Sequence, residues 1–395
     1  MYRIGKAEIE ELTRVIESKQ LFRQPDGEGH LGEVDAFEKE WAENVGVKYC
    51  LMNSGGGTGA LICALVGLGI GPGDEVIVPA YTFMATAVAV LAAGAIPVIA
   101  EIDDTMAIDP EDVERLIGPN TKAVIPVHIQ GMCADMAKIC DIARKHGIKV
   151  IEDACQADGG SFHGKRLGSW GEVGCFSFNQ YKIITCGEGG AMVTDDPIIY
   201  ERAQMYHDSG LCFRPVAKGI KTPIFTGLQM RASELMGAVM RMQLKTMPGI
   251  LADLRRIRNR MMAELEGKPG IRFARSNDNE GDSGVTAVFQ FDSEEKARAF
   301  ATAPGIKVAC LPIDSEKHVY CNWEPVLEHR AGGHPSLNPF NLPQNQSLRM
   351  NYNKDMCPKT LDILSRTVYV YSLLDSSDAE VTELIQACEK AARAL

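Results

Sequence analysis

The sequence lacks three features that would each point to a particular class of protein. It has no run of apolar residues long enough to cross a bilayer, no excess of positive charge and no paired cysteine motif. Its 41 Lys and Arg residues against 52 Asp and Glu residues give a net charge of −11, which argues against nucleic acid or an anionic membrane as a partner. The 12 cysteines are scattered, with no CxxC pair and no Cys/His spacing typical of a metal site, and they therefore indicate reduced thiols without a bound metal.

The N-terminal residues have the pattern of an amphipathic helix rather than that of a signal peptide, so a soluble, cytoplasmic protein is expected. A chain of 395 residues is too long for one small core and predicts two lobes, or one large domain with an appendage. Strand and helix patterns alternate through the first part of the chain, which predicts an α/β fold with a doubly wound, mostly parallel sheet. The strands are expected at residues 49–52, 75–79, 96–102, 123–129 and 148–152. Functional residues should then gather beyond the carboxyl ends of these strands.

A glycine-rich loop, NSGGGTG at residues 53–59, follows the first of these strands and precedes a helix expected at residues 60–68. A strand, a glycine loop and a helix in this order place free backbone N–H groups and a helix N-terminus where they can bind a phosphate. The segment matches neither the GxxxxGK[ST] nor the GxGxxG motif, so ATP and dinucleotides are weak candidates. A plain tight turn would also account for the glycines.

Two further strand ends carry residues of chemical interest. Tyr81, Thr82 and Phe83 follow the strand at residues 75–79, while Asp153 ends the strand near residue 152 and Gln156 lies three residues further on. An isolated aspartate after a strand is often a helix N-cap. Beside an anion-binding loop and an aromatic residue, its carboxylate would also suit a protonated heteroaromatic nitrogen.

Lys182 lies between the aromatic Phe176 and Phe178 and the aliphatic Ile183 and Ile184, ahead of a glycine turn at residues 187–190. Apolar surroundings disfavour the charged form of a lysine and favour a nucleophilic amine, although a snorkelling surface lysine would fit the same pattern. A lysine, an acid, an aromatic ring and a phosphate loop together meet the needs of pyridoxal phosphate. Each of them serves a different part of that cofactor.

Several segments that contain these residues resemble a known family. They are GIGPGDEVIVPAYTF, TKAVIPVHIQG, IEDACQADGG, GCFSFNQYKIITCGEGGAMVTDD and GLQMRASELMGAV. The sequence is similar to the DegT/DnrJ/EryC1/StrS sugar aminotransferases, which are pyridoxal-phosphate enzymes of fold type I. The resemblance weakens after about Met247. It implies a large cofactor-binding domain with an N-terminal helix at residues 1–248 and a small C-terminal α+β domain at residues 249–395.

The resemblance also implies a role for each site residue. Lys182 would bind the cofactor covalently and act as the catalytic residue, and Asp153 would pair with the pyridinium nitrogen. The other cofactor contacts implied are Gln156 near the phenolic oxygen, Phe83 on the ring face, and Gly56, Gly57, Thr58 and Ser177 at the phosphate. Relatives that act as dehydratases carry His at the position of Lys182, so the lysine favours amino transfer.

The chain departs from the family pattern in the segment GLQMRA. Family members usually have an asparagine there that reaches the phosphate of the neighbouring subunit, whereas this chain has Gln229, and Ala232 replaces the usual methionine. The amide is retained on a longer side chain. The resemblance therefore implies a homodimer with shared active sites, in which Gln229 contributes to the partner's cofactor site.

The resemblance implies glutamate or glutamine as the amino donor and a sugar ketone or aldehyde as the acceptor. The segments at residues 206–210, 322–325 and 357–368 resemble a subgroup that acts on free cyclitols or on octulosonic acids. The specific acceptor expected is the 8-oxo form of 3-deoxy-manno-octulosonate, as used in lipopolysaccharide synthesis; a nucleotide-linked keto-sugar and a cyclitol ketone are the alternatives. A carboxylated acceptor would need a cation, for which Arg231, Arg349 and His207 are candidates.

Two rival functions share the same residues. A pyridoxal-phosphate-binding regulator without turnover would need a DNA-binding motif, and none is present in this acidic chain. A lyase of the same fold would differ in failing to take an amino group from glutamate.

The C-terminal part is expected to begin with a helix at residues 250–265, directly after Pro248 and Gly249. Its further strands and helices are expected at 271–273, 285–291, 293–301, 306–311 and 379–394, with a long loop at 329–351.

Overall fold

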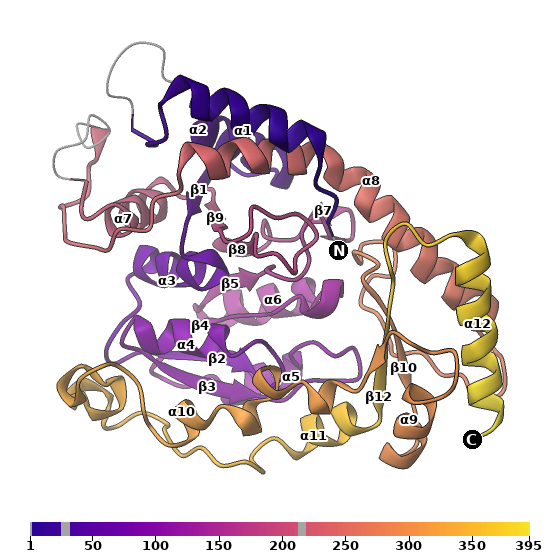
Figure 1. Cartoon of the computed structure of the whole chain (residues 1–395). Helices are drawn as coiled ribbons and strands as arrows, with labels where there is room; N and C mark the ends of the chain where they lie inside the picture. Colours follow the sequence, from indigo (N-terminus) through magenta and orange to yellow (C-terminus); the bar gives the residue numbers. More distant parts are fainter. Residues whose placement is uncertain (1, 25–31, 212–218) are drawn as a thin grey trace.

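The computed structural model describes residues 2–24, 32–211 and 219–395 (Figure 1). Its centre is a seven-stranded sheet in the order β1-β9-β8-β5-β4-β2-β3. The strands are β1 (Tyr49–Asn53), β2 (Glu75–Pro79), β3 (Ile96–Ala100), β4 (Thr121–Val124), β5 (Lys149–Asp153), β8 (Val173–Ser177) and β9 (Gly190–Thr194). Only β9 runs antiparallel to its neighbours, β8 and β1. The predicted doubly wound, mostly parallel sheet is therefore confirmed.

Helices cover both faces of this sheet, because its central strands are apolar on both sides. In β2, Val76 and Val78 belong to one buried cluster and Ile77 to the other, as the two-residue period of a strand requires. One cluster includes α3 (Gly56–Leu68) and α4 (Ala85–Ala92), and α7 (Pro197–His207) packs on α3. The other includes α2 (Glu33–Val45), α5 (Pro110–Leu116) and α6 (Met136–His146). A small hairpin, β6 (Ser161–Phe162) and β7 (Lys165–Arg166), follows β5.

Two elements differ in length from the prediction, and each has a local cause. Helix α3 begins at Gly56 rather than near residue 60, because the glycine loop itself forms its first turn. Strand β4 ends at Val124 rather than extending to residue 129, since Pro126 cannot donate to a strand ladder. The main chain nevertheless continues beside β5, where the Asp153 N–H donates to the Pro126 carbonyl at 2.9 Å.

The last part of the chain contains a second, three-stranded antiparallel sheet in the order β10-β12-β11. Its elements are β10 (Thr286–Gln290), β11 (Ala309–Cys310), β12 (Thr367–Tyr371), α9 (Glu294–Ala301) and α12 (Asp378–Arg393). The central strand β12 was not predicted. The strand expected at residues 271–273 is reduced to an isolated bridge between Phe273 and Phe289.

Helix α8 (Glu234–Leu265) is 32 residues long and contains Pro248. The helix expected to begin at residue 250 therefore begins 16 residues earlier, at Glu234. Its first part packs on α1 (Lys6–Ser18) and α2, and its second part on β10 and α12 (Figure 1). This packing outweighs the hydrogen bond that a proline removes from a helix. Among the described helices, none combines the length and the apolarity needed to cross a membrane.

Between β11 and β12 the chain returns to the large sheet and runs along its β3 side, through α10 (Glu324–Leu327) and α11 (Pro358–Ser365) (Figure 1). Val319 forms an antiparallel bridge with Tyr81, and the Tyr320 N–H donates to the Ala80 carbonyl at 2.9 Å. The buried side chains of Tyr320 and Trp323 join the same core cluster as β2. A segment from the last third of the chain is thereby fixed beside the end of β2.

Candidate active site

A cleft with a volume of about 880 Å³ lies at the carboxyl ends of the large-sheet strands. Strand ends of the large sheet line one side, and the other side is formed by Val285, Tyr371 and the residues around His318. Eight of the nine predicted site residues line this one cleft: Gly56, Gly57, Thr58, Phe83, Asp153, Gln156, Ser177 and Lys182. Residues up to 126 positions apart in sequence thus share a single site.

The glycine loop forms the floor of one end of the cleft. Gly55 is the N-cap of α3, and among the described residues no partner contacts the N–H groups of Gly56, Gly57 and Thr58. A Cβ at Gly57 would approach the Cys155 Sγ to 2.5 Å and the Ser177 Cβ to 3.1 Å, so a larger residue there would require the Cys155 side chain to shift. With the hydroxyls of Thr58 and Ser177 at the same place, this end of the cleft suits a phosphate.

Asp153 occupies the end of β5 and is 5 % exposed. The hydroxyl of Thr86 donates to its Oδ2 at 2.8 Å, and the N–H of Cys155 donates to its Oδ1 at 3.2 Å. Thr86 is fixed in turn by Thr82, whose Oγ1 lies 2.8 Å from the Thr86 Oγ1. The carboxylate is therefore held in one orientation at the wall of the cleft.

Lys182 lies in the turn that joins β8 to β9. Hydrogen bonds close this turn, with the Phe178 N–H on the Gly189 carbonyl at 2.7 Å and the Cys186 N–H on the Phe178 carbonyl at 3.1 Å. The side chain of Lys182 is half-buried, and its Nζ has neither an ion pair nor a hydrogen bond with any described residue. An amine that is held in a cleft without a partner is available to a ligand.

Phe83 and Gln156 complete the walls of the cleft. Phe83 is 44 % exposed, which is unusual for a large aromatic side chain at the centre of a fold. The Oε1 of Gln156 accepts a hydrogen bond from the Gln130 N–H at 3.1 Å, so its amide is already oriented. An exposed aromatic face and an oriented amide suit a flat, polar ring.

Gln229 does not line the cleft of its own chain. It is exposed and its main chain forms a bridge with Asp208. The contact that the resemblance implies would be made in the partner's site, so its place outside the cleft leaves that prediction open.

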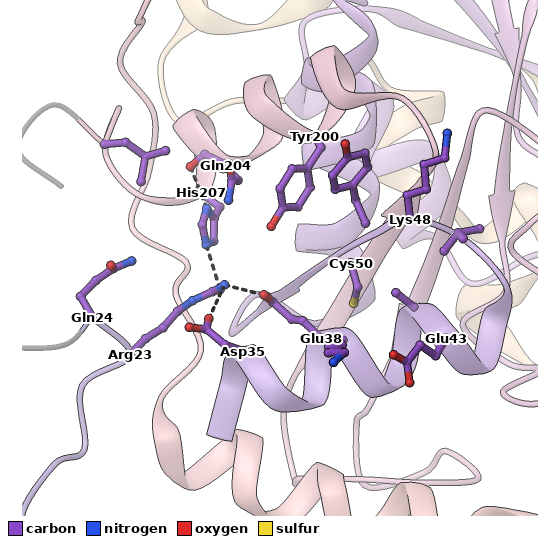
Figure 2. Close-up of a pocket in the computed structure, with 15 residues that line it drawn as sticks. Arg23, Gln24, Asp35, Glu38, Glu43, Lys48, Cys50, Tyr200, Gln204 and His207 are labelled. Atoms are coloured by element: carbon purple, nitrogen blue, oxygen red, sulfur yellow. Dashed lines mark hydrogen bonds and ion pairs between the residues drawn. The ribbon is translucent and has the colours of Figure 1, made fainter. Parts of the chain in front are cut away.

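The three cations considered for a carboxylated acceptor lie outside the cleft. Arg349 forms an ion pair with Glu75 at the amino end of β2, and Arg231 pairs with Asp208. His207 is buried beside Arg23 in a different cavity (Figure 2). Each of the three has a structural partner within its own chain that the sequence does not reveal.

The second cavity, of about 560 Å³, lies between α2, β1 and α7 (Figure 2). Three of the buried residues that line it, Arg23, Glu38 and His207, have partners within the protein. Arg23 donates to Glu38 at 2.6 Å and lies 3.5 Å from the His207 Nε2, and the Met52 N–H donates to Glu38 at 2.6 Å. Burial, reinforced by Arg23, lowers the pKa of His207 to about 3, so its ring is neutral near pH 7. We refer to Arg23, Glu38 and His207 as the arginine cluster.

Sequence reasoning missed two residues near Lys182. Asp158 is 1 % exposed and neither of its carboxylate oxygens has a hydrogen-bond partner among the described residues. Burial raises the pKa of Asp158 well above its usual range, while the charge of Lys182 acts against this shift. His318 comes from the returning C-terminal segment, and no pattern in its neighbourhood predicts which strand end it meets.

The model of the DegT/DnrJ/EryC1/StrS aminotransferase family matches residues 2–303. The L-glutamine:2-deoxy-scyllo-inosose aminotransferase of Streptomyces kanamyceticus is 36% identical over 68% of this chain and 64% of its own length. The GDP-perosamine synthase of Caulobacter vibrioides is 45% identical over 44% of this chain and 47% of its own length. The chain thus spans less than two thirds of these two curated relatives.

The fold is similar to solved structures over its whole length. The crystal structure of 3-amino-5-hydroxybenzoic acid synthase superposes with a TM-score of 0.78 at 28% sequence identity, and covers 100% of this chain and 98% of that chain. The family model covers more than half of the chain. This chain therefore belongs to the DegT/DnrJ/EryC1/StrS aminotransferase family.

Proposed function

We propose that this protein moves an amino group from glutamate or glutamine to the carbonyl carbon of a sugar or cyclitol. The observation that carries the proposal is that Lys182, the oriented Asp153 and the glycine loop meet in one cleft, where the Lys182 amine and the loop N–H groups have no partner among the described residues. The cofactor of this family is pyridoxal phosphate. These residues fit it, because the cleft offers an amine, a carboxylate, an aromatic face and an anion site.

Each group would hold one part of the cofactor. Lys182 would bind its carbonyl carbon and Asp153 its ring nitrogen. Phe83 would cover the ring face, Gln156 would contact the phenolic oxygen, and Gly56, Gly57, Thr58 and Ser177 would bind the phosphate. When bound, the cofactor supplies an electron sink for the carbanion that forms at the donor's α-carbon. Once Lys182 is released from the cofactor, its amine would take the proton from this carbon, and Asp153 would keep the ring nitrogen protonated.

For the acceptor, the named activities of the two curated relatives support a hydroxylated ring ketone, either a cyclitol or a nucleotide-linked sugar. The 8-oxo octulosonate suggested by the sequence carries a carboxylate. Among the described residues, Lys182 and Lys317 are the lysines that line the cleft, and no arginine lines it. Lys317 is therefore the cation that could pair with this carboxylate when Lys182 holds the cofactor. An acceptor panel should therefore contain a cyclitol ketone, a nucleotide-linked keto-hexose and the octulosonate aldehyde.

The phosphate end of the cleft is where a second subunit would contribute a side chain. The phosphate end of the cleft is lined by backbone N–H groups and hydroxyls, and no Lys or Arg of the described residues lines it there. We include in the proposal that a homodimer forms and that the partner's Gln229 contributes to this end. Light scattering on the purified protein would measure its mass, and a monomer would contradict this part.

The decisive experiment compares wild type with Lys182→Ala. Wild type with bound cofactor should absorb visible light, lose that band on addition of glutamate, and aminate one member of the acceptor panel. Lys182→Ala should lose the band and at least about 10³-fold of the turnover. Turnover retained in Lys182→Ala would refute the assignment, and a band that neither glutamate nor glutamine changes would favour a lyase or a regulator.

A further inference from the structure

The C-terminal segment brings one imidazole into the cleft. His318 lines the cleft together with Lys182, and its ring lies 5.4 Å from that of Phe83 and 6.4 Å from that of Tyr81. Its side chain is half-buried. Neither the family resemblance nor the sequence patterns assign this histidine a role.

The main chain around His318 is fixed to the large sheet. The Thr82 N–H donates to the His318 carbonyl and the Met84 N–H donates to the Lys317 carbonyl, both at 2.9 Å. The indole Nε1 of Trp323 donates to the same Lys317 carbonyl at 2.9 Å. These bonds, on either side of Phe83, set the position of the imidazole relative to the residue that would cover the cofactor ring.

The hydrogen bond of the ring determines its tautomer. Nδ1 lies 3.4 Å from the Ser315 carbonyl oxygen, which can only accept, so Nδ1 carries the hydrogen. In the neutral ring Nε2 therefore holds the lone pair, and it has no hydrogen bond with a described residue. Burial lowers the pKa of His318, and the positive charge of Lys182 lowers it further. The hydrogen bond to the Ser315 carbonyl raises it, but by less than burial lowers it. The ring is thus a neutral hydrogen-bond acceptor near pH 7.

We propose that His318 is a specificity-determining residue whose Nε2 accepts a hydrogen bond from a hydroxyl group of the acceptor sugar or cyclitol. This inference rests on the proposed function. Hydroxyl groups next to the carbonyl carbon are the feature that sugars and cyclitols share, and they need an acceptor in an enclosed site. A neutral Nε2 can accept this hydrogen bond, and it forms no ion pair with the ammonium or carboxylate group of the amino-acid donor.

A pair of variants separates this role from packing. His318→Phe keeps an aromatic ring beside Phe83 but removes Nε2, whereas His318→Gln supplies an amide oxygen at a similar reach. The matched control is His146→Phe, because His146 lies exposed on α6 away from the cleft. Each variant is purified with bound cofactor, and the two half-reactions are followed separately, the first by absorbance with glutamate and the second with the active member of the acceptor panel.

His318→Phe should raise the KM of the acceptor about tenfold or more, because a substrate hydroxyl loses its partner. Its rate of absorbance change with glutamate should stay within about twofold of wild type, and His318→Gln should recover most of the loss. Calorimetry should measure how tightly the same acceptor binds to each protein without cofactor. The affinity should be highest for wild type, lower for His318→Gln and lowest for His318→Phe. This readout does not require turnover.

Wild-type acceptor binding in His318→Phe would overturn the inference while leaving the proposed function intact. So would an equal loss in both half-reactions, or a His318→Gln variant no better than His318→Phe, since these indicate a packing role. If wild type reacts with glutamate but neither binds nor aminates any member of the panel, then the proposed acceptor class and this inference both fail.

Discussion

The cleft and the arginine cluster are both buried and charged, yet they differ in how their groups are satisfied. In the arginine cluster Arg23, Glu38 and His207 have partners within the chain. In the cleft the Lys182 amine and the first N–H groups of α3 have no partner among the described residues. Buried polar groups are normally hydrogen-bonded, so unpaired ones that open into a cavity mark the place where a ligand completes the structure. Charge and burial alone do not separate a binding site from a structural cluster.

The strongest test of this contrast is Asp153→Asn. The variant keeps the shape of the side chain but cannot hold the ring nitrogen of the cofactor in its protonated form. We expect the cofactor to remain bound and the rate with glutamate to fall roughly 10³-fold. Absorbance spectra measure the bound cofactor, and stopped-flow measures the rate.

Asp158→Asn is the matched control for that variant. Burial raises the pKa of the Asp158 carboxyl well above its usual range, and Asp158 does not line the cleft, so an amide there keeps the shape of the side chain and leaves the cleft's own groups in place. Its rate should remain close to that of wild type. If the two variants lost equal activity, two carboxyl groups near Lys182 would be essential rather than one.

Removing Arg23 should lower the stability of the fold and leave the cofactor site unchanged. Arg23→Met leaves Glu38 buried without its cation, and we expect the free energy of unfolding to fall by roughly 3 kcal/mol. Cofactor affinity should be unchanged, because the arginine cluster lies outside the cleft. Urea denaturation measures the first quantity and equilibrium dialysis the second.

The control here is Arg144→Met, which removes an ion pair with Asp141 whose two side chains are each 74% exposed. Its effect on stability should stay within about 1 kcal/mol. A large loss of cofactor affinity in Arg23→Met would show that the two regions are coupled.

The sequence predicted the residues of the cleft better than those of the arginine cluster, for a physical reason. Strand ends, glycine loops and a lysine in an apolar run are local signals, and a parallel sheet brings its strand ends together. The sequence could not show the partners of His207 and Arg231, because Arg23 and Asp208 are brought to them only by tertiary packing. The same limit hid β12, whose pairing with β10 joins segments about 80 residues apart, and the meeting of His318 with Phe83.

A pH-dependent effect is expected from His207. Its folded pKa of about 3 lies below the usual value of 6.5, so the unfolded chain binds the extra proton between these values. The stability that His207 contributes is therefore complete above about pH 6.5 and is lost as the pH falls. Between pH 6.5 and pH 5 wild type should lose up to about 2 kcal/mol more than His207→Asn. Urea denaturation at the two pH values would show it, and parallel losses in both proteins would contradict a neutral buried ring.

The smallest effect is expected at Gly57. A methyl group there would press on Cys155 and lie 3.1 Å from the Ser177 Cβ, so Gly57→Ala should weaken cofactor binding about tenfold. Gly5→Ala provides the control, because nothing lies within 4 Å of the added atom. Fluorescence titration with the cofactor would measure both. Equal cofactor affinities of Gly57→Ala and Gly5→Ala would show that Cys155 and Ser177 shift to accommodate the added methyl group.

Helix α8 also has a practical consequence for work with fragments of this chain. Residues 248–249 look like a natural place to divide it, yet they lie inside an uninterrupted helix. A cut there would divide α8 and separate its first part, which packs on α1 and α2, from its second part, which packs on β10 and α12. The two parts of the chain share α8. An exchange of C-terminal segments between relatives should therefore keep this helix whole and join the two sequences after Leu265.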